Sequence, residues 1–242
     1  MSTGTVLNKA DKKAPKMDVT DTIKQRKSIR AFLPDPIAKE DLHEMLFTAQ
    51  RAPSGSNVQP WKVIAITGQE RNAVIDLAMQ TFKTGVIGSR PVEPPFALDY
   101  DALDPIYRER SQKIGKLMNE AAGIERDDTE GRQKLVTRNF SFFDAPVGLF
   151  FVLDKRVNPA QWGHTGMYIQ TICLLAVERG WGTCIQEAWA MLRPELQVHF
   201  GLSHNERVWC GMSLGIPDYN SPANRYVTPR ADIDEVVSFR GF

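Results

Sequence analysis

The sequence predicts an α+β fold, in which helices flank a central sheet of about five strands. Three observations support this class. Segments with helical spacing of apolar residues are mixed along the chain with short apolar segments typical of strands. Residues 146–153 are apolar almost throughout, as expected of a central strand buried on both faces. Residues 161–179 form the longest clean helical segment, and because it is apolar nearly all round we expect it to be buried within the protein or between subunits.

The N-terminal half is predicted to contain helices around a single strand. Apolar residues recur at Leu42, Met45, Leu46 and Ala49, which is helical spacing. Gly68 closes the strand that precedes it. In chain order we expect a short helix over 18–27, a helix over 39–51, a strand over 61–67 and a helix over 69–83.

Residues 84–128 lose this regular spacing, and we interpret them as a lid-like insertion. Prolines at positions 91, 94, 95 and 105 exclude a continuous helix before Pro105, after which a helix over 107–122 can form. Long connections in compact domains are usually functional lids or disordered segments, so this stretch is a candidate lid.

The C-terminal half is predicted to supply most of the sheet. Gly180 is well suited to end the long helix in a left-handed conformation. In chain order we expect a helix over 131–143, strands over 146–153, 181–185 and 207–214 with helices over 161–179 and 191–200 between them, and a short strand over 235–239.

Length allows one large domain or two small ones, and we expect a single domain over 19–242 after a flexible tail over 1–18. The 30 basic and 29 acidic side chains nearly balance, so nothing directs the protein toward nucleic acid or an anionic membrane. No apolar run reaches the roughly 18 residues of a membrane span. Cys173, Cys184 and Cys210 lie far apart in apolar surroundings, which fits reduced thiols and a cytoplasmic location. The histidines show no ligand spacing, so we expect no metal site.

Two short motifs indicate a bound mononucleotide. Arg26, Ser28 and Arg30 occupy alternate positions, so they would point the same way in an extended segment, and the arginine fork suits a phosphate. The second motif, P-S-G-S-N-V-Q-P-W over 53–61, places hydroxyls and carboxamides on a loop. Carboxamides match the edge of a heterocycle that also carries donors and acceptors. Taken alone, the same residues also fit a solvated basic turn and a polar turn before a strand.

These motifs resemble the N-terminal signature of the FMN-dependent nitroreductase family, in particular its nitrobenzoate-reductase-like branch, and the agreement extends over roughly 19–242. Each motif is weak by itself, but four of them in the right order are specific. The resemblance implies a mostly antiparallel central sheet flanked by helices. It also implies an interlocked homodimer that exchanges C-terminal arms, here 216–242, with each FMN at the interface and contacted by both chains.

The resemblance also assigns residues to the FMN phosphate. Arg26, Ser28 and Arg30 would bind it with their side chains, whereas Lys27 alternates to the other face and would contribute its backbone. Arg230 resembles the family's late arginine, which reaches the same phosphate.

The remaining family positions surround the flavin ring and the substrate. The resemblance implies that no side chain acts as the catalytic group, because backbone N–H groups would meet flavin N5. The implied contacts to the ribityl chain and the pyrimidine edge are Pro53, Ser54, Ser56, Asn57, Gln59 and Asn139. The segment implied to lie near N5 is Gln186, Glu187 and Ala188. The lid residues implied to face the substrate are Phe96, Tyr100, Tyr107 and Met118. The family often has glycine where Ala188 stands, so contact geometry there is open.

The implied activity is reduction of nitroaromatic or quinone-like acceptors by NAD(P)H, in a ping-pong reaction through flavin N5. No G-x-G-x-x-G motif follows a strand, so the nicotinamide donor would visit and leave. The choice between NADH and NADPH stays open. A phosphate-selecting arginine could be Arg108, Arg110, Arg126 or Arg132.

Other functions remain possible at this point. Two relatives on the same fold are a reductive dehalogenase and an oxygen-dependent flavin-fragmenting enzyme. Glu109, Tyr107 and Lys113 have the residue types of the dehalogenase lid but no convincing spacing. A non-catalytic flavin or nucleotide sensor and a structural dimer without cofactor belong to other classes.

Overall fold

The computed structural model describes residues 17–85, 103–125 and 127–242. Its centre is one antiparallel sheet with the strand order β1-β2-β4-β3. This confirms the predicted α+β class with an antiparallel sheet. The strands are β1 Lys62–Thr67, β2 Val147–Asp154, β3 Gly182–Gln186 and β4 Glu206–Gly215.

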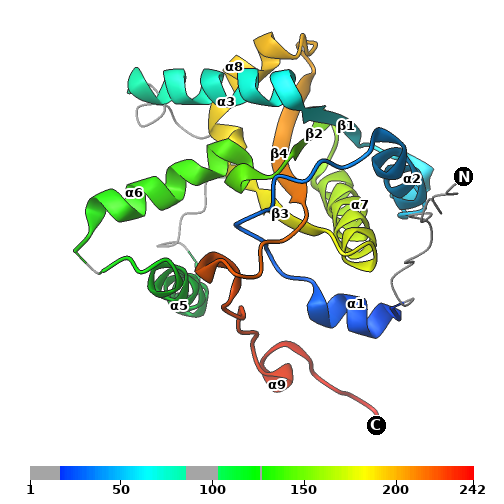
Figure 1. Cartoon of the computed structure of the whole chain (residues 1–242). Helices are drawn as coiled ribbons and strands as arrows, with labels where there is room; N and C mark the ends of the chain where they lie inside the picture. Colours follow the sequence, from blue (N-terminus) through cyan, green and yellow to red (C-terminus); the bar gives the residue numbers. More distant parts are fainter. Residues whose placement is uncertain (1–16, 86–102, 126) are drawn as a thin grey trace, which may run out of the picture.

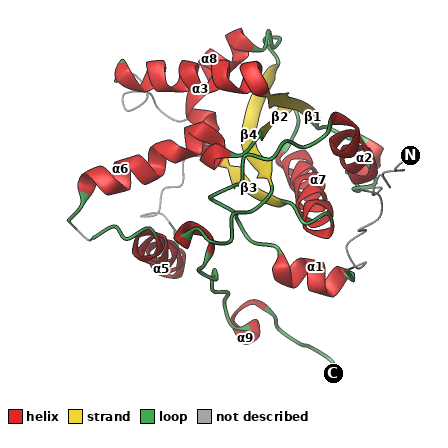
Figure 2. Cartoon of the chain, viewed as in Figure 1, coloured by secondary structure: helices red, strands yellow, loops and turns green. Residues whose placement is uncertain are grey.

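Helices cover both faces of this sheet (Figures 1 and 2). On one face lie α3 Gly68–Lys83, α8 Arg193–His199 and the 3₁₀ segments η2 Arg138–Asp144 and η3 Glu187–Leu192. On the other face lie α2 Lys39–Ala49 and α7 Pro159–Glu178. The central strand β2 is therefore buried on both sides, as its apolar sequence predicts.

Aromatic side chains fill the core on the η3 side. Trp189 is fully buried, stacks on Phe142 at 4.7 Å between ring centroids and meets Phe150 edge-on at 5.1 Å. Gly211 of β4 makes room for it, because a methyl group there would lie 2.3 Å from Trp189 Cδ1. On the other face Tyr168 of α7 stacks on Trp61 at 4.7 Å, so the partly buried Trp61 packs against the core.

The remaining elements lie at the periphery. They are α1 Val19–Gln25, the 3₁₀ segments η1 Gly55–Asn57 and η4 Pro222–Asn224, and the helices α5 Pro105–Ala121, α6 Thr129–Thr137 and α9 Ile233–Val236. Helix α1 packs beside the C-terminal end of α7 (Figure 1). Across the described ranges, we find no helix with the length and apolar character that a membrane span requires.

The predicted helix over 131–143 is partly wrong, because α6 ends at Thr137 and η2 follows. Phe142, Phe143 and Asp144 all have left-handed backbone, with φ of 55°, 52° and 70°. A continuing right-handed helix would not direct two successive phenylalanines into the core, whereas this turn buries both. Burial therefore overrides the local preference, at the cost of backbone strain.

The predicted strand over 235–239 is also wrong. Asp232 caps a short helical turn, α9, and Glu235 completes the capping box by accepting from the backbone of Asp232. The cap satisfies backbone N–H groups locally, so the β-branched residues that follow do not set the conformation.

Candidate functional site

The Arg26–Arg30 segment runs along the edge of the sheet and pairs with β3 at Ser28. Helix α1 ends at Gln25, Ser28 forms a parallel bridge with Thr183 of β3, and Ile29 N–H donates to Thr183 O at 2.9 Å. The buried Ile29 side chain packs where Gly182 has no side chain. Burial of Ile29 thus fixes the segment, while its neighbours Ser28 and Arg30 are half-buried.

A basic cavity of about 1000 Å³ lies beside this segment. It brings Arg26 and Arg230 together, as the resemblance implies, although they are far apart in sequence. Lys24 and Lys27 add two further cations, and none of the described residues that line the cavity is acidic. Such a wall fits a dianionic phosphate, because guanidinium and ammonium groups donate charge-assisted hydrogen bonds to its oxygens.

Two residues of this segment face differently from the expectation. Lys27 lines the basic cavity with its side chain, and its Nζ donates to Asn224 O at 2.5 Å. Arg30 turns instead toward Tyr226, whose hydroxyl oxygen accepts from Arg30 Nη1, and toward the Phe143 ring, 6.0 Å from the guanidinium carbon. The alternation begins only at Ser28, where the chain pairs with β3, so Arg26 and Lys27 do not alternate strictly.

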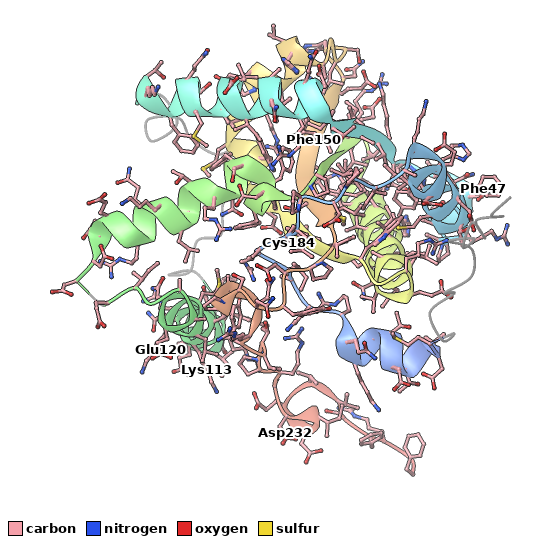
Figure 3. All side chains as sticks on the ribbon, viewed as in Figure 1. Phe47, Lys113, Glu120, Phe150, Cys184 and Asp232 are labelled. Carbon is pink, nitrogen blue, oxygen red and sulfur yellow. The ribbon has the colours of Figure 1, made fainter. Side chains whose placement is uncertain are left out.

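Three cysteines are buried in the core, and Cys173 and Cys184 lie near this segment. Burial raises the pKa of Cys173 to about 11, and burial also raises the pKa of Cys184, which lies near the Ser28 hydroxyl and at the centre of the molecule (Figure 3). Cys210 is buried too, and its pKa is raised for the same reason. These thiols are therefore protonated and unreactive near neutral pH.

Asn224 holds the Arg26–Arg30 segment to the C-terminal arm, and sequence reasoning missed it. Its side chain is 2% exposed; Oδ1 accepts from Arg30 N–H at 2.7 Å, and Nδ2 donates to Ala31 O and Asp218 O, both at 2.8 Å. No local signal identifies this residue, because Asn224 and Arg30 are 194 positions apart.

The Ser54–Gln59 loop has an unusual backbone. Ser56, Asn57 and Gln59 have positive φ of 52°, 53° and 49°, although none of them is glycine. Ser54 Oγ accepts from Gln59 N–H at 2.9 Å, and Gln59 Nε2 donates to Asn57 O at 2.9 Å. The side chains of Ser56 and Asn57 are exposed, as is Pro53 before them. Left-handed non-glycine residues cost energy and cluster at binding sites, so this loop is a candidate ligand contact.

This loop and the basic cavity contact α7 at different positions. Gly55 N–H donates to His164 Nδ1 at 3.3 Å near the start of the helix, whereas Gln170, further along it, lines the basic cavity. These two positions are about 9 Å apart along the helix axis, and no residue of the Ser54–Gln59 loop, which the structure describes in full, lines the cavity. A single chain therefore presents the two predicted halves of the site at separate places.

The segment after β3 is held firmly by hydrogen bonds. Gln186 is 1% exposed; its Nε2 donates to Asn139 O at 2.5 Å, and its Oε1 accepts from Ser213 Oγ at 2.9 Å. Its side chain is thus used internally, so any ligand contact there comes from backbone. Glu187 is exposed at the start of η3, and Ala188 is half-buried.

The predicted lid residues are only partly visible. Phe96 and Tyr100 lie outside the described residues. Tyr107 and Met118 are both on α5, Tyr107 half exposed and Met118 partly buried. Neither lines the basic cavity. Among the residues that the structure describes, no group of three or more His, Cys, Asp and Glu could hold a metal ion.

The fold and these motifs define a family. A model of the Nitroreductase family matches residues 23–216, and the chain belongs to this family. It is 35% identical to 4-nitrobenzoate reductase of Pseudomonas putida over 225 residues, covering 93% of this chain and 96% of that protein. Identity to nitrobenzene nitroreductase of Ectopseudomonas oleovorans is also 35%, with 91% and 96% covered.

Solved structures agree with this assignment. The FMN and NADPH-dependent nitroreductase NfnB from Sphigopyxis sp. strain HMH superposes with a TM-score of 0.89 at 33% identity, covering 93% of this chain and 100% of that chain. NfnB from Mycobacterium smegmatis, solved in complex with NADPH, gives 0.84 at 26% identity, with 90% and 96% covered. A BluB-like flavoprotein from Clostridium difficile gives 0.63 at 20% identity, with 93% and 99% covered, which shows the shared fold alone.

Proposed function

We propose that this protein is an FMN-dependent NAD(P)H oxidoreductase that reduces nitroaromatic or quinone-like acceptors. The observation that carries this proposal is the basic cavity of a nitroreductase fold, where Arg26, Lys27 and Arg230 meet and no carboxylate is present among the described lining residues. Relatives at 35% identity are named for nitrobenzoate and nitrobenzene reduction, and the most similar structures described above are named for FMN and NADPH.

The residues present fit the parts of FMN. Arg26, Lys27 and Arg230 would bind the phosphate in the basic cavity. The exposed polar side chains of the Ser54–Gln59 loop would contact the ribityl chain and the pyrimidine edge. When bound, FMN would supply a two-electron redox centre that takes hydride from NAD(P)H at N5 and delivers it to the acceptor.

The chain itself would bind and orient rather than react. Backbone N–H groups at Glu187 and Ala188 would lie near N5, and oriented donors there stabilise charge on a reduced ring. The buried Gln186 amide holds this segment through Asn139 and Ser213, so the donors are fixed before any ligand arrives. No side chain is required as an acid or a nucleophile, because protons can come from water.

We further propose a cytoplasmic homodimer. The Ser54–Gln59 loop and the basic cavity share no residue and contact α7 at different positions, so one chain would supply the phosphate-binding cavity and its partner the loop. The C-terminal arm exposes Val227, Val236 and Phe239, which are 80%, 62% and 67% accessible, and such apolar side chains suit burial on a second copy. Reduced, buried cysteines fit the cytoplasm.

Anaerobic mixing of the purified protein with NADPH tests the activity. We expect a yellow protein that bleaches and then regains its colour when 4-nitrobenzoate is added. A protein that holds FMN but does not bleach with NADPH or NADH is a sensor, and a colourless protein that accepts no FMN is a structural dimer. Halide release or oxygen-dependent loss of the flavin would identify the dehalogenase or the flavin-fragmenting enzyme; the comparisons support the reductase over both.

Two arginines of the arm offer a matched test of the phosphate site. Arg230 lines the basic cavity, whereas Arg225 Nη2 donates to Asn220 O at 2.5 Å away from it. We expect Arg230→Ala to purify with less than about a tenth of the wild-type flavin, since a charge-assisted contact contributes about 1.5–3 kcal/mol. Arg225→Ala should keep its flavin. Flavin content is measured by absorbance after gel filtration. Equal flavin content in both variants would mean that Arg230 does not bind the phosphate.

A further inference from the structure

A second cavity, of about 720 Å³, lies between α5 and the C-terminal arm. Its volume is in the range of small-molecule sites, about 300–1000 Å³. Helix α5 contributes one wall and the arm before and within α9 contributes the other. The residues used below are Ile106, Glu109, Arg110, Lys113, Arg230 and Glu235.

Cations outnumber carboxylates in this cavity. Its lining includes three cations, Arg110, Lys113 and Arg230, and two carboxylates, Glu109 and Glu235. Arg110 Nη2 donates to Glu235 Oε2 at 2.7 Å, and this hydrogen bond lowers the pKa of Glu235. Glu235 therefore neutralises Arg110 and ties α9 to α5. Figure 3 labels Lys113 on α5 and Asp232, the cap of α9.

The position of the cavity links it to the proposed flavin site. Arg230 lines both this cavity and the basic cavity with Arg26 and Lys27, so the two adjoin. A dinucleotide whose nicotinamide reaches the flavin must leave its adenosine end outside the flavin site. Apolar walls such as Ile106 suit an adenine ring, and the cations suit a phosphomonoester, which carries about −1.5 to −2 charge at pH 7.

We propose that this cavity binds the adenosine end of NADPH and that Arg110 and Lys113 select NADPH over NADH through its 2′-phosphate. This inference rests on the proposed reductase function and names the donor of that reaction. Of the arginines that the sequence left open, Arg110 lines the cavity, and Lys113 was not among those candidates. Arg126 lies outside the described residues.

Substitutions of Glu235 and of Lys113 should change the affinity for the phosphate in opposite directions. Glu235 competes with the phosphate for Arg110, so Glu235→Gln should strengthen binding, while its amide oxygen still completes the α9 capping box. Lys113→Gln should weaken binding. Lys116→Gln is the matched control on the same helix, because Lys116 pairs with Glu120 at 3.7 Å and does not line the cavity.

The experiment is calorimetric titration of the FMN-loaded protein with adenosine 2′,5′-bisphosphate and with adenosine 5′-monophosphate. We expect Lys113→Gln to weaken the bisphosphate Kd about tenfold, the scale of one charge-assisted hydrogen bond. Glu235→Gln should lower the bisphosphate Kd about threefold, because Arg110 is then released from an exposed ion pair with Glu235. Lys116→Gln should match the wild type, and the monophosphate should be unaffected throughout. The KM for NADPH should move in parallel, with the KM for NADH unchanged.

Three results would overturn the proposal: equal shifts for both nucleotides, no shift in any variant, or a raised KM for 4-nitrobenzoate with that for NADPH unchanged. The last would assign the cavity to a carboxylate-bearing acceptor. The titration needs no turnover, so its failure is distinct from failure of the reductase function, which appears as a protein that neither NADPH nor NADH bleaches.

Discussion

At the scale of single residues, the site depends on polar groups that sequence reasoning identified and on others that it could not. The interpretation of Arg26, Ser28 and Arg30 as one row assumed an extended segment; the structure has extended backbone where Ser28 pairs with Thr183, but it turns Arg30 toward Tyr226. Asn224 and Tyr226 were not predicted, because their contacts to this segment join opposite ends of the chain. A local motif can reveal residue types and spacing, but not a partner brought close only by the fold.

Asn224→Ala should destabilise the protein by about 1–3 kcal/mol, because Arg30 N–H loses its acceptor and the carbonyls of Ala31 and Asp218 each lose one of their two donors. Urea unfolding of the FMN-free protein measures this. Asn220→Ala is the control: Asn220 is exposed, so the change should stay within about 0.5 kcal/mol. Equal unfolding free energies for the two variants would mean that Asn224 does not hold the segment.

Tyr226→Phe should remove the hydrogen bond that holds the Arg30 side chain while keeping the aromatic ring in place. The hydroxyl of Tyr226 accepts from Arg30 Nη1, and burial raises its pKa, so it is neutral at physiological pH. If Arg30 supports the phosphate site, the variant should bind FMN about fivefold more weakly while its affinity for riboflavin, which lacks the phosphate, is unchanged. Fluorescence titration of both flavins separates these cases. A parallel loss for both flavins would indicate general damage rather than a role at the phosphate.

At the scale of elements, the long periodic segments were predictable and the strained ones were not. Helix α7 and strand β2 lie where their apolar patterns place them. The left-handed turn through Phe142 and Phe143 replaces a predicted helical end, because burying both rings outweighs local preference. The positive φ values of Ser56, Asn57 and Gln59 were likewise not predicted, because these residue types do not by themselves require a left-handed backbone. In both places the surrounding tertiary structure imposes a conformation that the local sequence disfavours.

Gly211→Ala tests the packing that holds η3, the element that begins with Glu187 and Ala188. A methyl group there would lie 2.3 Å from Trp189 Cδ1, so the indole and η3 must move. We expect a loss of about 1–3 kcal/mol in urea unfolding and a shifted flavin absorption band. Gly115→Ala on α5 is the control: the added methyl meets nothing within 4 Å, and alanine should stabilise the helix by up to about 1 kcal/mol. Similar stabilities for the two variants would contradict this account of η3.

At the scale of the whole molecule, the predicted class and family are confirmed, while the assembly stays a proposal. The resemblance placed the flavin between two copies. The chain on its own separates the Ser54–Gln59 loop from the basic cavity along α7 and leaves an apolar arm exposed. Composition and periodicity cannot predict this arrangement, because it depends on how two surfaces of one sequence meet.

Sedimentation velocity of the flavin-loaded protein, followed at a visible flavin wavelength, tests the central claim most directly. The account predicts that all bound flavin sediments with a species of twice the chain mass, at one flavin per chain, and that dilution into single chains releases it. Flavin that remains bound to a species of single-chain mass would contradict the claim that two copies form the site.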